Sequence, residues 1–161
     1  MHQSISFDYQ LFDNDNPLKP DLRKLLQAAN DAVELSYAPY SRFHVGAALL
    51  LSNGEIVKGS NQENASFPAG ICAERVALSV ASSLFPLEKI TAVAISYRNG
   101  AEPSSLEHIL SPCGICRQSL LETTQRQQHA IQVILSSPAG QIIYLKNADS
   151  LLPLAFSSHH L

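Results

Sequence analysis

The sequence predicts an α/β fold in which helices cover one sheet on both faces, a three-layer α-β-α sandwich. Segments with apolar residues at helical spacing alternate with short, almost wholly apolar segments that are typical of buried strands. Strands that are apolar on both sides need cover on both faces of their sheet. The 161 residues have the length of one domain, so we expect a single domain over residues 1–161 with five strands.

The first half of the chain contains one expected helix and one expected hairpin. Residues 20–33 open with Pro-Asp, which suits a first helical turn, and continue with apolar residues at helical spacing. The apolar segment 44–52 predicts a strand. The Asn-Gly pair that follows is typical of a two-residue hairpin turn, so a second strand is expected near 55–59.

The second half of the chain adds two helices and three strands. A segment rich in Ala, Val and Leu predicts a helix over 72–84, and another helix is expected to begin near Cys113. Three largely apolar segments predict strands at 89–97, 130–136 and 141–145. Residues 98–112 are expected to form a loop, and a short helix is expected after Asn147.

The two ends of the chain differ from this pattern. Apolar and polar residues alternate over 4–12, which indicates a short strand or an extended arm. We interpret residues 1–19 as an amino-terminal arm and 157–161 as a solvated tail. The sequence shows neither a signal-peptide pattern nor a membrane span, so we expect a cytoplasmic protein with reduced thiols.

Charge and cysteine content narrow the classes of function. The formal net charge is −3, and the 11 Lys and Arg residues are scattered along the chain. Because nucleic-acid binding depends on clustered cations, we expect a small-molecule substrate, with neither nucleic acid nor membrane as a partner. Three cysteines, an odd number, fit poorly with a closed disulfide framework.

All three cysteines lie at expected helix starts. The positive end of a helix favours the thiolate, which is the form that binds a metal. Cys113 and Cys116 are three residues apart, so one helical turn can point both sulfurs the same way, and Cys72 completes a set of three. Zinc with three protein ligands keeps its fourth position open for water. The sequence therefore predicts a catalytic Zn²⁺ site.

Charged residues adjoin these cysteines. Glu74 follows Cys72 by two residues, so it can exchange protons with a zinc-activated water without being a ligand. Three thiolates leave the zinc site with a net negative charge that a nearby cation would offset. Arg75 and Arg117 each lie next to a ligand-bearing turn, and we expect at least one of them to donate hydrogen bonds to the thiolates.

Three blocks of sequence resemble the cytidine deaminase family in its small three-cysteine branch. They are Ala-Pro-Tyr-Ser-Arg-Phe-His-Val-Gly-Ala-Ala at 38–48, Asn-Gln-Glu-Asn-Ala-Ser-Phe-Pro-Ala-Gly-Ile-Cys-Ala-Glu-Arg at 61–75, and Pro-Cys-Gly-Ile-Cys-Arg-Gln at 112–118. Zinc deaminases combine such a ligand set with a glutamate that is not a ligand. The resemblance covers about residues 37–156 and implies a mixed five-stranded sheet of the cytidine deaminase type.

The resemblance also implies roles for individual residues. The three cysteines would hold zinc, Glu74 would be the catalytic proton shuttle, and Arg75 and Gln118 would support the zinc ligands. The implied substrate contacts are Asn61 and Glu63 on the ribose hydroxyls, Phe43 and the Ala73 backbone on the pyrimidine, and Phe156 from a neighbouring subunit. In one departure from the family pattern, Phe67 stands where many relatives carry tyrosine.

The implied activity is hydrolytic deamination of cytidine and 2′-deoxycytidine to uridine and 2′-deoxyuridine, with release of ammonia. Zinc-activated water would be the nucleophile, and a free pyrimidine nucleoside of pyrimidine salvage would be the substrate. Relatives of this length form homotetramers, so a homotetramer is expected ahead of a homodimer.

Alternative functions account for fewer of these residues. Pro-Cys-Gly-Ile-Cys at a helix start also resembles a thioredoxin-type redox motif, but this interpretation leaves Cys72 and Glu74 unexplained. A zinc-stabilised binding module gives Glu74 no role. The charge balance disfavours a deaminase of polynucleotides, and an enzyme acting on another aminated nucleoside stays open.

Overall fold

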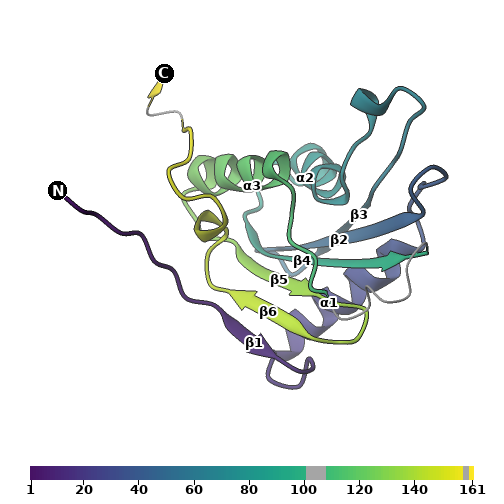
Figure 1. Ribbon diagram of the computed structural model, residues 1–161, viewed down its shortest axis with the longest axis horizontal. Helices are drawn as coiled ribbons and strands as arrows, with labels where there is room; N and C mark the ends of the chain where they lie inside the picture. The colour runs from purple at the N-terminus through teal and green to yellow at the C-terminus, as the bar shows by residue number, and fades with distance from the viewer. Residues whose placement is uncertain (101–107, 158–159) are drawn as a thin grey trace.

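The computed structural model describes residues 1–100, 108–157 and 160–161. One face of its sheet is covered by α1 (Pro20–Val33), and the other by α2 (Ala73–Leu84) and α3 (Gly114–Gln127) (Figure 1). The predicted three-layer α/β sandwich is confirmed. Each predicted helix lies within a residue or two of its expected bounds, and Asn147 caps a short 3-10 helix, η3 (Ala148–Leu151), with its side chain.

The sheet has six strands rather than the predicted five, in the order β1-β6-β5-β4-β2-β3. Its strands are β1 (Gln10–Phe12), β2 (Phe43–Leu51), β3 (Ile56–Ser60), β4 (Ile90–Asn99), β5 (Gln132–Ser136) and β6 (Ile142–Leu145). The β4–β5 pair is parallel and the other pairs are antiparallel, so the sheet is mixed, as expected.

The additional strand is the end of the segment interpreted as an arm. Gln10 pairs with Tyr144 and Phe12 with Ile142, so β1 extends the sheet beyond β6. The alternation over 4–12 indicates a short strand or an extended arm, and the last three residues of that segment form the strand.

Two glycines bring helices close to the sheet. A Cβ atom on Gly46 would lie 2.2 Å from the Ala29 carbonyl oxygen of α1, and one on Gly59 would lie 2.4 Å from the Ala73 carbonyl oxygen of α2. No side chain fits at either distance. Gly59 therefore allows the first turn of α2, which follows Cys72, to pack directly on β3.

The central strands alternate their side chains between two cores. Val93 and Ile95 of β4 pack under α2 and α3, whereas Ala92 and Ala94 pack against α1. These four residues are fully buried. This alternation explains the almost wholly apolar strands in the sequence.

Some expectations fall partly outside the described residues. Residues 101–107 of the expected 98–112 loop are outside them, and β4 reaches Asn99. Residues 158–159 of the tail are also outside. No helix in the described part of the chain has the length and apolar character needed to cross a membrane.

Candidate metal centre and active site

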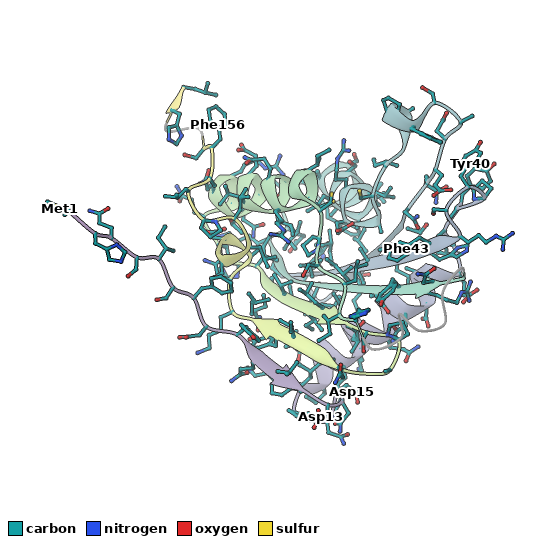
Figure 2. The ribbon with its side chains drawn as sticks, in the orientation of Figure 1. Met1, Asp13, Asp15, Tyr40, Phe43 and Phe156 are labelled. Atoms are coloured by element: carbon teal, nitrogen blue, oxygen red, sulfur yellow. The ribbon has the colours of Figure 1, made fainter. Side chains whose placement is uncertain are left out.

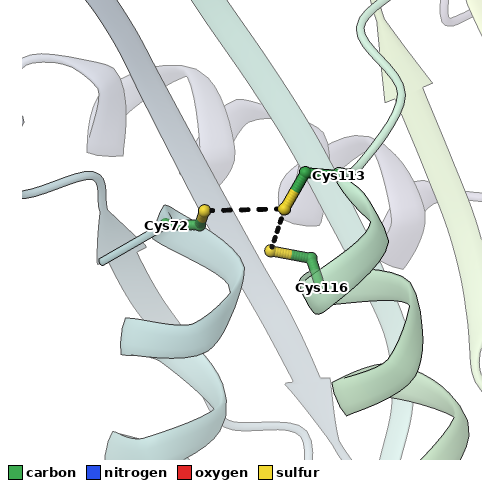
Figure 3. A group of neighbouring side chains, drawn as sticks. All are labelled: Cys72, Cys113 and Cys116. Carbon is green, nitrogen blue, oxygen red and sulfur yellow. Dashed lines mark hydrogen bonds between the residues drawn. The ribbon is translucent and has the colours of Figure 1, made fainter. Parts of the chain in front are cut away.

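The three cysteines lie where two helices begin side by side (Figure 3). Cys72 is the N-cap of α2 and Cys113 is the N-cap of α3, both with extended backbone. Cys116 lies in the first turn of α3 and is fully buried. All three therefore sit at the positive end of a helix, which favours the thiolate form.

The separations of the three sulfurs fit a zinc ion. Sγ of Cys113 lies 3.8 Å from Sγ of Cys72 and 3.4 Å from Sγ of Cys116, and all three lie within 4.8 Å of one another. Zinc–sulfur bonds of about 2.3 Å in tetrahedral geometry place two sulfurs about 3.8 Å apart. Cys113 is exposed and Cys72 is half-buried. The cluster thus reaches the surface on one side, which leaves room for a fourth ligand from solvent or substrate.

The surroundings shift the pKa values of Cys72 and Cys116 in opposite directions. A hydrogen bond from Cys116 lowers the pKa of Cys72 to about 6, with a smaller lowering from the nearby Arg75. The pKa of Cys116 is raised by the same hydrogen bond and by burial. The lowered pKa favours the thiolate form of Cys72, which is the form that binds a metal cation.

Glu74 is buried beside the sulfurs, in the first turn of α2. Its side chain is 4% exposed, and burial raises the pKa of its carboxyl, while a hydrogen bond from Cys116 partly opposes the rise. A carboxyl whose pKa is shifted towards neutrality can both accept and return a proton. The structure thus places a buried carboxyl beside the sulfurs, and its role in proton transfer stays a prediction.

The two arginines near the ligands have different contacts. Arg117 donates from Nε to the Pro112 carbonyl oxygen at 2.8 Å and from a terminal nitrogen to the Leu151 carbonyl oxygen at 3.2 Å. It therefore joins the segment before Cys113 to η3. Arg75 is the remaining candidate for a thiolate contact, because its charge lowers the pKa of Cys72.

A pocket of about 520 Å³ opens beside Cys72. Its lining is mostly uncharged and polar or aromatic: Tyr40, Ser41, Asn61, Gln62, Glu63, Asn64, Phe67, Gly70, Ile71 and Cys72. The rings of Tyr40 and Phe67 meet edge to face, with centroids 6.0 Å apart. Asn61 and Glu63, predicted from the sequence to bind ribose, thus share a cavity with a metal ligand.

Asn61 and Glu63 are held in place by the backbone around them. The Asn61 amide accepts from the Val45 N–H at 2.8 Å and donates to the Phe43 carbonyl at 2.9 Å. Glu63 accepts hydrogen bonds from the backbone of Tyr40 and Ser41 and from the Ser41 hydroxyl. The sequence analysis missed these loop partners, although Tyr40 and Ser41 lie inside the first of the three blocks.

The other residues implied by the resemblance lie in three places. Ala73, fully buried, begins α2 next to Cys72. Phe43 begins β2 and stacks on Tyr97, with ring centroids 5.2 Å apart. Figure 2 shows Phe156 on the carboxy-terminal segment, well apart from Tyr40 and Phe43.

Gln118 is attached to that segment rather than to a sulfur. Its Nε2 donates to the Phe156 carbonyl oxygen at 3.0 Å. Phe156 itself is 59% exposed and stacks on His160. Its ring therefore faces outward from the chain that carries it.

Comparison with known proteins identifies the zinc-binding region. The family model described as cytidine and deoxycytidylate deaminase zinc-binding region matches residues 19–131. This match includes all three cysteines, and their convergence agrees with zinc as the cofactor.

Relatives and solved structures extend the likeness over most of the chain. Cytidine deaminase of Halalkalibacterium halodurans is 36% identical over 138 residues, which is 86% of this chain and 96% of the relative. That of Sporosarcina psychrophila is 36% identical over 141 residues, 88% of this chain and 95% of the relative. The crystal structure of cytidine deaminase from Burkholderia pseudomallei has a TM-score of 0.72 at 35% identity, and the match covers 83% of this chain and 98% of the other. The crystal structure of cytidine deaminase from Mycobacterium tuberculosis has a TM-score of 0.66 at 32% identity, and the match covers 86% of this chain and 99% of the other. The chain belongs to the cytidine and deoxycytidylate deaminase family.

Proposed function

We propose that this protein is a zinc-dependent hydrolase that deaminates free cytidine and 2′-deoxycytidine. The products are uridine or 2′-deoxyuridine and ammonia, as in pyrimidine salvage. The observation that supports this most strongly is the convergence of three sulfurs within 4.8 Å beside the buried carboxyl of Glu74. The relatives reported above are named cytidine deaminases.

Glu74 moves the protons in the proposed reaction. Cys72, Cys113 and Cys116 would hold the zinc ion, which would lower the pKa of a water molecule and so make it a nucleophile near neutral pH. A Glu74 carboxylate oxygen accepts a proton from the attacking water and passes it to N3 of the base. After hydroxide has added to C4, the same carboxylate takes the proton of the C4 hydroxyl and delivers it to the amine, so that the carbonyl forms as the C4–N bond breaks and ammonia leaves. Burial supports this role, because it brings the pKa of the carboxyl closer to the working pH.

The pocket lining favours a free nucleoside over a nucleotide. Asn61 and Glu63 offer an amide and a carboxylate, which suit the hydroxyls of a ribose. A phosphate calls for Arg, Lys or a set of backbone N–H groups. None of the described residues that line this pocket is an Arg or a Lys. The substrate proposed is therefore uncharged.

Assembly and location are part of the same proposal. We place Phe156 in the base pocket of a neighbouring subunit within a homotetramer, which agrees with its exposed ring and its distance from the chain's own pocket. The whole chain is proposed to be one domain. A cytoplasmic location suits the three free cysteines, because thiols stay reduced there.

An ammonia-release assay over a panel of substrates tests the activity. The panel holds cytidine, 2′-deoxycytidine, deoxycytidylate, adenosine and single-stranded DNA, each with zinc-loaded protein. We expect release from the first two only. Faster release from deoxycytidylate would reject the nucleoside assignment, and no release from any cytosine compound would reject the activity.

A further inference from the structure

Residues 1–9 form an extended arm that the family does not account for. The family match begins at residue 19, and every residue of the arm is exposed. Figure 1 shows the arm leaving β1 and running away from the sheet towards the amino terminus. At the rise of an extended chain, nine residues reach about 30 Å, so the arm can contact another molecule.

The arm and β1 share one apolar side. Leu11 pairs with Ile143, which packs on the core under α2 and α3, whereas Phe12 pairs with Ile142 and packs on the α1 side. Because alternate residues of an extended chain point the same way, the odd-numbered residues follow Leu11. These residues form an apolar strip, exposed by 49 to 62%: Ile5, Phe7, Tyr9 and Leu11.

The outer edge of β1 is a second surface, beside the apolar strip, that a partner strand could pair with. It is the outermost strand of the sheet, and no other strand among the described residues pairs with its outer edge, which can therefore offer N–H and C=O groups to a partner. Proteins protect such edges with charged residues, especially lysine, or with proline. Residues 1–12 contain no Lys, Arg or Pro, and an exposed apolar strip beside a free edge is typical of a surface that is covered in use.

The partner that fits this surface is a second copy of the chain. A two-fold contact uses the same surface on both molecules, and here one segment holds both the free edge and the apolar strip. The arm has one charged side chain, Asp8, so it offers little to a partner recognised by charge. We propose that residues 1–9 dock along the β1 edge of a second copy, so that the two sheets join and the apolar strips are covered.

Photo-cross-linking of the purified full-length protein tests the docking. In the variant Phe7→p-benzoylphenylalanine we expect a covalent dimer on a denaturing gel, with the linked peptide inside residues 1–18 of the other copy. The matched variant Ser6→p-benzoylphenylalanine, whose reactive group faces away from the strip, should give several-fold less dimer. Monomer only, or a linked peptide elsewhere in the chain, would overturn the proposal.

Hydrogen exchange tests it without a reactive group. Backbone amides of residues 4–9 should exchange at least about tenfold more slowly than in an unstructured chain, because a ladder to the partner protects them. The double variant Phe7→Ser/Tyr9→Ser should lose this protection, while Ser4→Ala/Ser6→Ala should keep it. Unprotected arm amides in the unmodified protein at all concentrations would refute the docking.

Discussion

The Ser41 hydroxyl donates a hydrogen bond to the Glu63 carboxylate, across 22 residues of sequence. The loop after α1 thereby orients a side chain that lines the proposed ribose pocket. Two backbone N–H groups of the same loop, from Tyr40 and Ser41, donate to the second carboxylate oxygen. The Glu63 side chain is thus already fixed before a substrate binds, which reduces the conformational entropy lost on binding.

Removal of this hydroxyl should weaken substrate binding more than it slows chemistry. For Ser41→Ala we expect KM for cytidine to rise several-fold with kcat nearly unchanged, because Glu63 loses the hydroxyl that fixes its orientation. Steady-state kinetics measure both. Ser83→Ala, which removes a hydroxyl that bonds to the Ser79 carbonyl within α2, is the control and should change neither constant. An unaltered KM in Ser41→Ala would contradict the assigned contact.

The same hydrogen bond predicts a pH dependence. Donation from Ser41 holds the pKa of Glu63 below its usual range, because the charged form is the one stabilised. The ionised carboxylate therefore persists as the pH falls, until the pH passes through this lowered pKa. The dissociation constant of uridine, measured by calorimetry from pH 7 downward, should begin to rise at a higher pH in Ser41→Ala than in the unmodified protein. Coincident profiles would count against the coupling.

Glu74→Gln separates zinc binding from proton transfer. The amide keeps the shape of the side chain but cannot carry a proton between water, N3 and the amine. We expect full zinc content with turnover lower by at least about 10²–10⁴-fold. Metal analysis and ammonia release on one sample measure both, with Glu122→Gln on the exposed part of α3 as control. Turnover comparable to that of the unmodified protein would show that Glu74 is not the shuttle.

The two arginines should respond differently to removal. Arg117→Ala breaks hydrogen bonds to the Pro112 and Leu151 carbonyls and should lower the free energy of unfolding by about 1.5–3 kcal/mol. Arg75→Ala removes a charge that favours the Cys72 thiolate and should lower zinc affinity with a smaller effect on unfolding. Denaturant unfolding and competition with a chelator distinguish the two. If both variants lost the same quantity, the division of roles would be wrong.

Gly59→Ala tests how α2 is seated. The new Cβ would lie 2.4 Å from the Ala73 carbonyl oxygen, so the first turn of α2 must move away from β3. Overpacking of this kind costs about 1–3 kcal/mol of stability, and the shift should also weaken zinc binding through Cys72. Gly114→Ala is the matched control, because nothing lies within 4 Å of a Cβ there. Equal thermal stability of the two variants would contradict the packing described.

The sequence predicts the metal centre well because its signals are local. Each cysteine adjoins a helix start, and helix starts are set by capping, proline and apolar spacing over a few residues. Two such starts separated by 41 residues still converge, since both helices cover the same face of the sheet.

Contacts between distant segments were not predictable in this way. At least one of Arg75 and Arg117 was expected to contact a thiolate, and nothing in the sequence indicated that Arg117 bonds to Leu151, 34 residues away. Gln118 likewise bonds to the Phe156 carbonyl oxygen, 38 residues away. The hydrogen-bond partner of a polar side chain depends on which segments pack around it in the fold, and residue spacing in the sequence does not determine that packing. The alternation over 4–12 left a short strand and an extended arm as alternatives, because the pairing that makes β1 a sixth strand is with β6, near the other end of the chain.

In the proposed reaction one zinc ion, held by Cys72, Cys113 and Cys116, is required for deamination. The most direct test is to strip the protein of metal with a chelator, return zinc in measured steps, and follow ammonia release from cytidine. We expect no release without zinc, then a linear rise that stops at one zinc ion per chain. Full activity in the stripped protein, or a rise that continues well beyond one equivalent, would contradict the account.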